Sequence, residues 1–141
     1  MTRLIQIAET EADTLRCFDV MHELRPHLTR QEFIERVARQ RAQGYHLAFL
    51  ECEGVVRSVT GYRLLETLAW GRIMHVDDLV TRSGDHGGGF GSALLDWLIR
   101  EAKQAGCAQL HLDSGVQRFG AHRFYLHKGL DITCHHFALK F

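Results

Sequence analysis

The sequence predicts an α/β (α+β) fold, with a mixed and mostly antiparallel central sheet and about four flanking helices. Three observations lead to this prediction: two capping patterns that each open a helix, an antiparallel hairpin after them, and a strand, helix, strand unit in the second half. The chain has 141 residues, 45% of them hydrophobic and 24% charged. We therefore expect one domain, residues 1–141, with a buried core.

The first half of the chain predicts a short strand, two helices and a hairpin. Apolar residues over 4–7 indicate the strand, and apolar side chains then recur at helical spacing until Pro26 ends the first helix. The second helix closes at Gly44. The capping pairs are Thr10 with Asp13 and Thr29 with Glu32, and the hairpin strands are residues 45–51 and 55–65, joined by a turn at Glu53 and Gly54.

The second half begins with a strand over residues 70–81 that runs into a glycine-rich turn. A helix follows from Ser92 to Gly106, with leucines at helical spacing, and then a strand over 107–114. A last helix over 118–128 is stopped by Gly129, and residues 132–141 are expected to form a terminal strand or hairpin arm. No internal repeat or linker suggests a second domain.

The glycine turn, residues 86–92, is the segment most suggestive of a ligand. It lies where a strand ends and a helix begins, and the start of a helix exposes unpaired backbone amides to an anion. Glycine allows positive φ and a close approach of the backbone to a phosphate, so the natural occupant is a pyrophosphate. Taken alone, the same run is also typical of a flexible surface loop.

Two other phosphate-binding patterns do not fit the turn. A nucleotide P-loop needs Lys followed by Ser or Thr after its last glycine, whereas Gly91 is followed by Ser92 and Ala93. A Rossmann fingerprint would lie near the chain start and would need more parallel strands than the sequence offers. Both patterns are rejected.

Taken together, four segments resemble the GNAT superfamily of N-acetyltransferases over roughly residues 4–141. The resemblance rests on the pair formed by the glycine turn and the later helix, and on the distance between them. The segments are Asp78-Leu79-Val80-Thr81, the turn from His86 to Gly91 with Ser92-Ala93-Leu94-Leu95 after it, Ala121-His122-Arg123-Phe124-Tyr125, and Lys128-Gly129-Leu130.

The resemblance implies acetyl-CoA as the acetyl donor. The strand ending at residues 79–81 would splay from its parallel partner at 110–114 and offer its backbone to pantetheine, while the glycine amides hold the pyrophosphate. His86 stands where the family has Arg or Gln, and because a histidine changes charge near neutral pH, cofactor affinity is expected to depend on pH. The expected cofactor-binding residues are Leu79, Val80, Thr81, His86, Gly87, Gly88, Gly89, Phe90, Gly91, Ser92, Arg118 and Tyr125.

Acetyl transfer needs a neutral amine, stabilisation of the oxyanion and a proton for the departing thiolate. Tyr125 matches the family's tyrosine near the cofactor sulfur and is our candidate for the acid; an amphipathic core tyrosine is the alternative. Asp77 and Asp78 are expected to point to opposite faces of their strand, so at most one meets the amine. We favour Asp77, where relatives often carry Glu, with His75 as the second choice.

A metal site is not expected. The adjacent pair His135 and His136 would face oppositely on a strand, and His122 and His127 are five apart on a helix instead of three or four. The four scattered cysteines read as reduced, packed thiols, and the apolar run at the start is too short for a signal peptide or a membrane span. These features favour a cytoplasmic protein.

The acceptor remains open among three readings. The first is a primary amine on a small molecule, with a weak hint of an anionic amine because residues 121–126 are similar to aminoalkylphosphonate acetyltransferases. A protein or peptide amine would need an open groove beside residues 25–29, and a non-catalytic acetyl-CoA sensor would bind without turnover.

Equal numbers of acidic and basic residues give no overall positive field to attract nucleic acid or anionic membranes. Exposed terminal strands make a homodimer one expectation.

Overall fold

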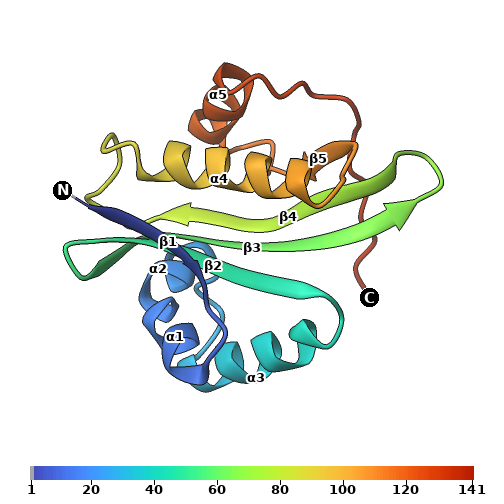
Figure 1. Ribbon diagram of the computed structural model, residues 1–141. Helices are drawn as coiled ribbons and strands as arrows, with labels where there is room; N and C mark the ends of the chain where they lie inside the picture. Colours follow the sequence, from blue (N-terminus) through green and yellow to red (C-terminus); the bar gives the residue numbers. More distant parts are fainter. Residues whose placement is uncertain (1) are drawn as a thin grey trace. The chain divides into compact units, whose positions relative to one another are not determined.

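The computed structural model describes residues 2–141, which form two compact units, one ending at His111 and one beginning at Leu112. Figure 1 labels the elements along the chain. In order they are β1 (Arg3–Ile7), α1 (Glu11–Arg16), α2 (Phe18–Leu24), α3 (Arg30–Arg41), β2 (Tyr45–Cys52), β3 (Val55–Thr67), β4 (Gly71–Thr81), α4 (Phe90–Gln104), β5 (Gln109–Leu112) and α5 (Phe119–His127).

The sheet has the strand order β1-β2-β3-β4-β5 and is antiparallel from β1 to β4. β5 runs parallel to β4, and the Ala108 amide next to it donates to the Arg72 carbonyl at 2.8 Å, at the start of β4. β5 has only four residues, so the second half of β4 extends beyond it. The predicted mixed, mostly antiparallel sheet with a parallel pair is confirmed.

In the first unit, helices cover both faces of the sheet (Figure 1): α1, α2 and α3 lie on one face and α4 on the other. Under the first three helices, Phe18, Met21 and Phe33 pack with the buried face of β2. Under α4, Leu50 and Cys52 pack with Phe90 and Leu94. The sheet therefore separates two layers of helices, and the side chains of β4 point into one layer or the other.

The helix expected before Pro26 is two helices, which makes five in the described residues where about four were expected. The break lies at Cys17, whose amide donates to the Thr14 carbonyl three residues back, at 3.0 Å. A change from four-residue to three-residue hydrogen bonding leaves the spacing of apolar side chains almost intact. The sequence pattern therefore did not show the break.

A β-bulge in β4 overturns the expectation that Asp77 and Asp78 face oppositely. Asp78 pairs with Gly61 and Val76 with Tyr62, so Asp77 is an extra residue without a partner in β3. Asp77 bonds to Arg63 and Asp78 to Tyr45, and the Arg63 guanidinium stacks on the Tyr45 ring. Because a bulge interrupts the alternation of side chains, both carboxylates point to the face that carries α1–α3.

The expected terminal strand is wrong: residues 130–141 form neither helix nor strand. The alternating apolar side chains that predicted it are largely exposed, including Phe137 at 90% and Leu139 at 80%. Alternation indicates a strand only where a neighbouring strand supplies hydrogen bonds and covers the apolar face. Within residues 2–141, none of the helices has the length and apolar character needed to cross a membrane.

Candidate functional site

The turn between β4 and α4 has a backbone that requires glycine. Gly84, Gly87 and Gly89 have φ values of 89°, 88° and 80°, which side chains rarely tolerate. A Cβ at Gly88 would lie 2.9 Å from the Phe90 ring, and one at Gly91 would lie 2.9 Å from the Thr81 hydroxyl. The glycines thus permit both the reversal of the chain and the close packing of α4 on the end of β4.

The first turn of α4 presents its amides without a competing side chain. Gly89 is the N-cap, no side chain caps this helix, and no acidic residue lies in its first turn. By contrast, Thr10 caps α1 and Thr29 forms a capping box on α3. An uncapped helix start with its positive dipole end fits the pyrophosphate that the sequence predicts there.

Side chains remote in the sequence hold the turn in shape. Asp85 accepts from Arg82 Nε at 2.7 Å and from Arg57 Nη1 at 3.2 Å. Both hydrogen bonds lower the pKa of Asp85, and the one from Arg82 has the larger effect. Arg3, from β1, donates to the Gly88 carbonyl at 2.7 Å and lies over the Phe90 ring at 4.7 Å. Arg3 thus places a cation at the turn that no sequence pattern indicated.

The predicted cofactor-binding residues of the first unit lie together. Leu79 packs in the α4 layer and Val80 in the opposite layer, while Thr81 Oγ1 lies 3.2 Å from Ser58 Oγ at the end of β4. His86 is exposed in the turn. Phe90 and the two residues after it form the first turn of α4, which begins two residues before the expected Ser92.

The two predicted site residues of the second unit lie at the start and in the last turn of α5. Arg118 is the N-cap of this helix and Tyr125 lies two turns further. Burial raises the pKa of Tyr125, and the charge of Arg118 offsets part of that effect. The Tyr125 phenol is therefore protonated throughout the neutral range, as a proton donor must be.

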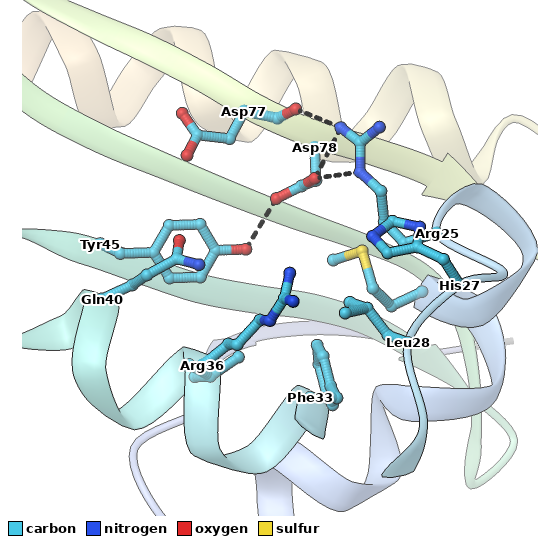
Figure 2. Close-up of a pocket in the computed structure, with 11 residues that line it drawn as sticks. Arg25, His27, Leu28, Phe33, Arg36, Gln40, Tyr45, Asp77 and Asp78 are labelled. Atoms are coloured by element: carbon cyan, nitrogen blue, oxygen red, sulfur yellow. Dashed lines mark hydrogen bonds and ion pairs between the residues drawn. The ribbon is translucent and has the colours of Figure 1, made fainter. Parts of the chain in front are cut away.

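A cavity of about 240 Å³ lies beside β4, on the face that carries α2 and α3. Figure 2 shows Asp78 at its centre. The Asp78 carboxylate accepts from Arg25 Nε at 2.9 Å and from the Tyr45 hydroxyl at 2.8 Å. Arg25 also donates to the Asp77 carbonyl at 3.0 Å. Burial, with Asp78 beside it, raises the pKa of Tyr45 well above its ordinary value.

Asp77 borders the same cavity but is held by a different set of partners. Its carboxylate accepts from Arg63 Nε at 2.7 Å and lies 2.8 Å from His75 Nδ1. Burial acts to raise the pKa of Asp77, but the hydrogen bonds of His75 and Arg63 together outweigh it, and the net pKa is lowered. The bonded carboxylate is therefore ionised at neutral pH.

The sequence pattern did not indicate most of the residues that line the cavity. Arg25 and His27 lie in the segment after α2 that was expected to border the acceptor site, but Arg36, Gln40 and Tyr45 were not singled out. Helical spacing was a usable signal for α3, because Phe33, Arg36, Val37 and Gln40 lie on one face of a helix. Nothing in the sequence indicated that this face meets the bulge.

The chain matches the family model of the Acetyltransferase (GNAT) family over residues 2–130. It is 32% identical over 112 residues to an uncharacterized N-acetyltransferase, YhdJ, of Bacillus subtilis, covering 79% of each chain. It is also 40% identical over 57 residues to an aminoalkylphosphonate N-acetyltransferase of Salmonella typhimurium, covering 40% of this chain and 37% of that protein. A crystal structure of a transcriptional regulator from Bacillus halodurans has the same fold, with a TM-score of 0.88, 20% identity and coverage of 99% and 100%.

Proposed function

Since the chain belongs to the GNAT family of acetyltransferases, we propose that it moves an acetyl group from acetyl-CoA to a primary amine on a small molecule. The observation that carries this proposal is the placement of a charged cavity on one face of β4 and a glycine-built anion cradle at the end of the same strand. The family match spans residues 2–130, so we also propose that both compact units act as one N-acetyltransferase domain.

The cradle fits the charged part of the donor. The first-turn amides of α4 bind the pyrophosphate, with Arg3 adding a positive charge at the Gly88 carbonyl and His86 at the edge of the turn. The second half of β4, which extends beyond β5, offers its backbone at residues 79–81 to the pantetheine arm. Bound in this way, the donor supplies the acetyl group as a thioester.

The cavity fits a small acceptor better than a protein segment. Pockets for drug-sized ligands have volumes of roughly 300–1,000 Å³, and this cavity, at about 240 Å³, is smaller. Its lining carries charged side chains from α3, β4 and the segment after α2. An acceptor lysine or N-terminal peptide would need an open groove beside residues 25–29 that is larger than this cavity, which Arg25, His27 and Leu28 line. This comparison favours the small amine over the peptide.

Two side chains carry the proton transfers in this scheme. As the amine attacks the thioester carbonyl, a backbone amide near Leu79 or Val80 stabilises the oxyanion. Breaking of the C–S bond leaves a thiolate, which takes the proton of the Tyr125 hydroxyl, and solvent then returns a proton to the Tyr125 phenolate. Asp77 receives the proton lost by the amine, through water; its lowered pKa makes it a weak base that passes the proton on to solvent.

The test is release of free thiol from acetyl-CoA with a panel of primary amines, with peptides that carry lysine or a free N-terminus included. We expect release with one or more small amines and none with the peptides. Release only with peptides would replace the proposed acceptor. Tight acetyl-CoA binding without release for any amine or peptide would overturn the enzyme in favour of an acetyl-CoA sensor.

A further inference from the structure

The two carboxylates of the cavity are already compensated by neighbouring groups. Asp78 is bonded by Arg25 and Tyr45, and Asp77 by Arg63 and His75. An incoming ammonium would have to displace these partners, and the reaction in any case needs the amine in its neutral form. The carboxylates therefore have little attraction left for a positively charged group elsewhere on the acceptor.

Arg36 lines the cavity with donors to spare, whereas Arg25 is bonded to Asp78 and to the Asp77 carbonyl. The ion pair of Arg36 is with Glu32, one turn earlier on α3, at 3.9 Å, and its side chain is 46% exposed. Glu32 is already used in the capping box, where it accepts from the Thr29 amide. Figure 2 shows the Arg36 guanidinium directed into the cavity, toward the space between Tyr45 and Leu28.

Two further donors border the same space. Gln40 lies one turn after Arg36, and because its side-chain oxygen accepts from Arg63 Nη2 at 2.6 Å, its amide nitrogen is a donor. His27 lines the cavity from the segment after α2. The cavity thus offers a guanidinium and an amide from α3 and an imidazole from the segment after α2, donors suited to a carboxylate, phosphonate or phosphate.

We propose that Arg36 determines acceptor specificity by binding an anionic group of the acceptor, so that the substrates are small primary amines that carry a carboxylate, phosphonate or phosphate. This inference rests on the proposed function. The cavity, at about 240 Å³, lies just below the roughly 300–1,000 Å³ of pockets for drug-sized ligands, which suits an amine and an anion joined by a short chain. Arg36 is a substrate-binding residue in this scheme, and Asp77 and Tyr125 carry the proton transfers.

The test compares three amines with the same two-carbon spacer: 2-aminoethylphosphonate, β-alanine and ethanolamine. For each amine, the ratio of kcat/KM between a variant and the natural protein cancels the amine's own reactivity. Arg36→Gln should lower kcat/KM about 10- to 100-fold for the two anionic amines, mainly through KM, and leave ethanolamine within about twofold. Arg36→Lys should restore part of the loss because it keeps the charge.

Arg39→Gln is the matched control. Arg39 is an exposed arginine on the same helix that does not line the cavity, so its loss should change none of the three ratios. Thermal unfolding of each variant excludes loss of the fold. An equal loss for all three amines in Arg36→Gln, or no preference of the natural protein for the anionic amines, would overturn the proposal.

Calorimetric binding of 2-aminoethylphosphonate separates this proposal from the proposed function. If the natural protein releases no thiol with any amine but binds this compound, and Arg36→Gln abolishes binding, the anion site stands and the acetylation of small amines fails. If thiol is released with neutral amines only and the compound does not bind, the acetylation stands and the anion site fails.

Discussion

Gly61 lies against Tyr45, which lines the cavity. Gly61→Ala should therefore lower the free energy of unfolding and displace the Tyr45 ring. A Cβ at this position would lie 1.7 Å from the Tyr45 hydroxyl and 2.3 Å from the ring carbon that bears it, so the ring has to move. Tyr45 is only 4% exposed and is bonded to Asp78. Overpacking of a core costs about 1–3 kcal/mol, and a hydrogen bond to a charged group contributes about 1.5–3 kcal/mol.

The free energy of unfolding should therefore fall by about 2.5–6 kcal/mol, a large share of the roughly 5–15 kcal/mol of an ordinary domain. Urea unfolding followed by circular dichroism measures it. Gly120→Ala is the matched control, because a Cβ there meets no atom within 4 Å and the position lies inside α5, where alanine favours the helix. In a Tyr45→Ala background the Gly61 substitution should cost less than about 1 kcal/mol. A loss below about 1 kcal/mol in the natural background would refute the reasoning.

Three further outcomes are expected. Tyr125→Phe should lower kcat about 100-fold with little change in the Kd for acetyl-CoA, because phenylalanine keeps the aromatic ring and removes only the acid hydroxyl; unchanged turnover would end the assignment of Tyr125 as the acid. His86→Ala should weaken acetyl-CoA binding, measured by calorimetry, because a donor to the pyrophosphate is lost, and an unchanged Kd would contradict this. Asp77→Asn should lower the free energy of unfolding by about 1–3 kcal/mol at pH 7. The folded-state pKa of Asp77 is lowered, so its stabilisation is full above its ordinary pKa of 3.8 and is lost as pH falls through the folded value. The free energies of unfolding of the variant and the natural protein should therefore converge below about pH 4. A difference between them that stays constant to pH 3 would show that the carboxylate charge is not responsible.

The glycine turn was predictable because its function depends on the backbone. Positive φ at Gly87 and Gly89 and an uncapped helix start follow from residue types that are adjacent in the chain. The cation that Arg3 adds to the turn was not predictable, since 85 residues separate Arg3 from Gly88 and only the sheet brings β1 to the turn. The family resemblance implied acetyl-CoA, and the uncapped start of α4 fits its pyrophosphate.

The acceptor side shows the limit of sequence periodicity. The alternation rule placed Asp77 and Asp78 on opposite faces, and a single unpaired residue in β4 reversed that result. Whether a strand contains a bulge depends on how it aligns with its partner, here Gly61 and Tyr62 of β3, and not on its own residue types. The terminal strand failed for a related reason, because strands require a partner that the apolar residues of 132–141 do not have.

By itself, the sequence determined the helix starts at Thr10 and Thr29, the hairpin of β2 and β3, and the strand, glycine turn and helix formed by β4 and α4. Each depends on interactions within a few residues, which propensity and capping rules describe well. Only the tertiary structure decided the chemistry of the cavity, because hydrogen bonds across the fold join Arg25 to Asp78 and Arg63 to Asp77 over gaps of 53 and 14 residues. Those contacts compensate both carboxylates, whereas Arg36 pairs with Glu32 at 3.9 Å and its guanidinium is directed into the cavity.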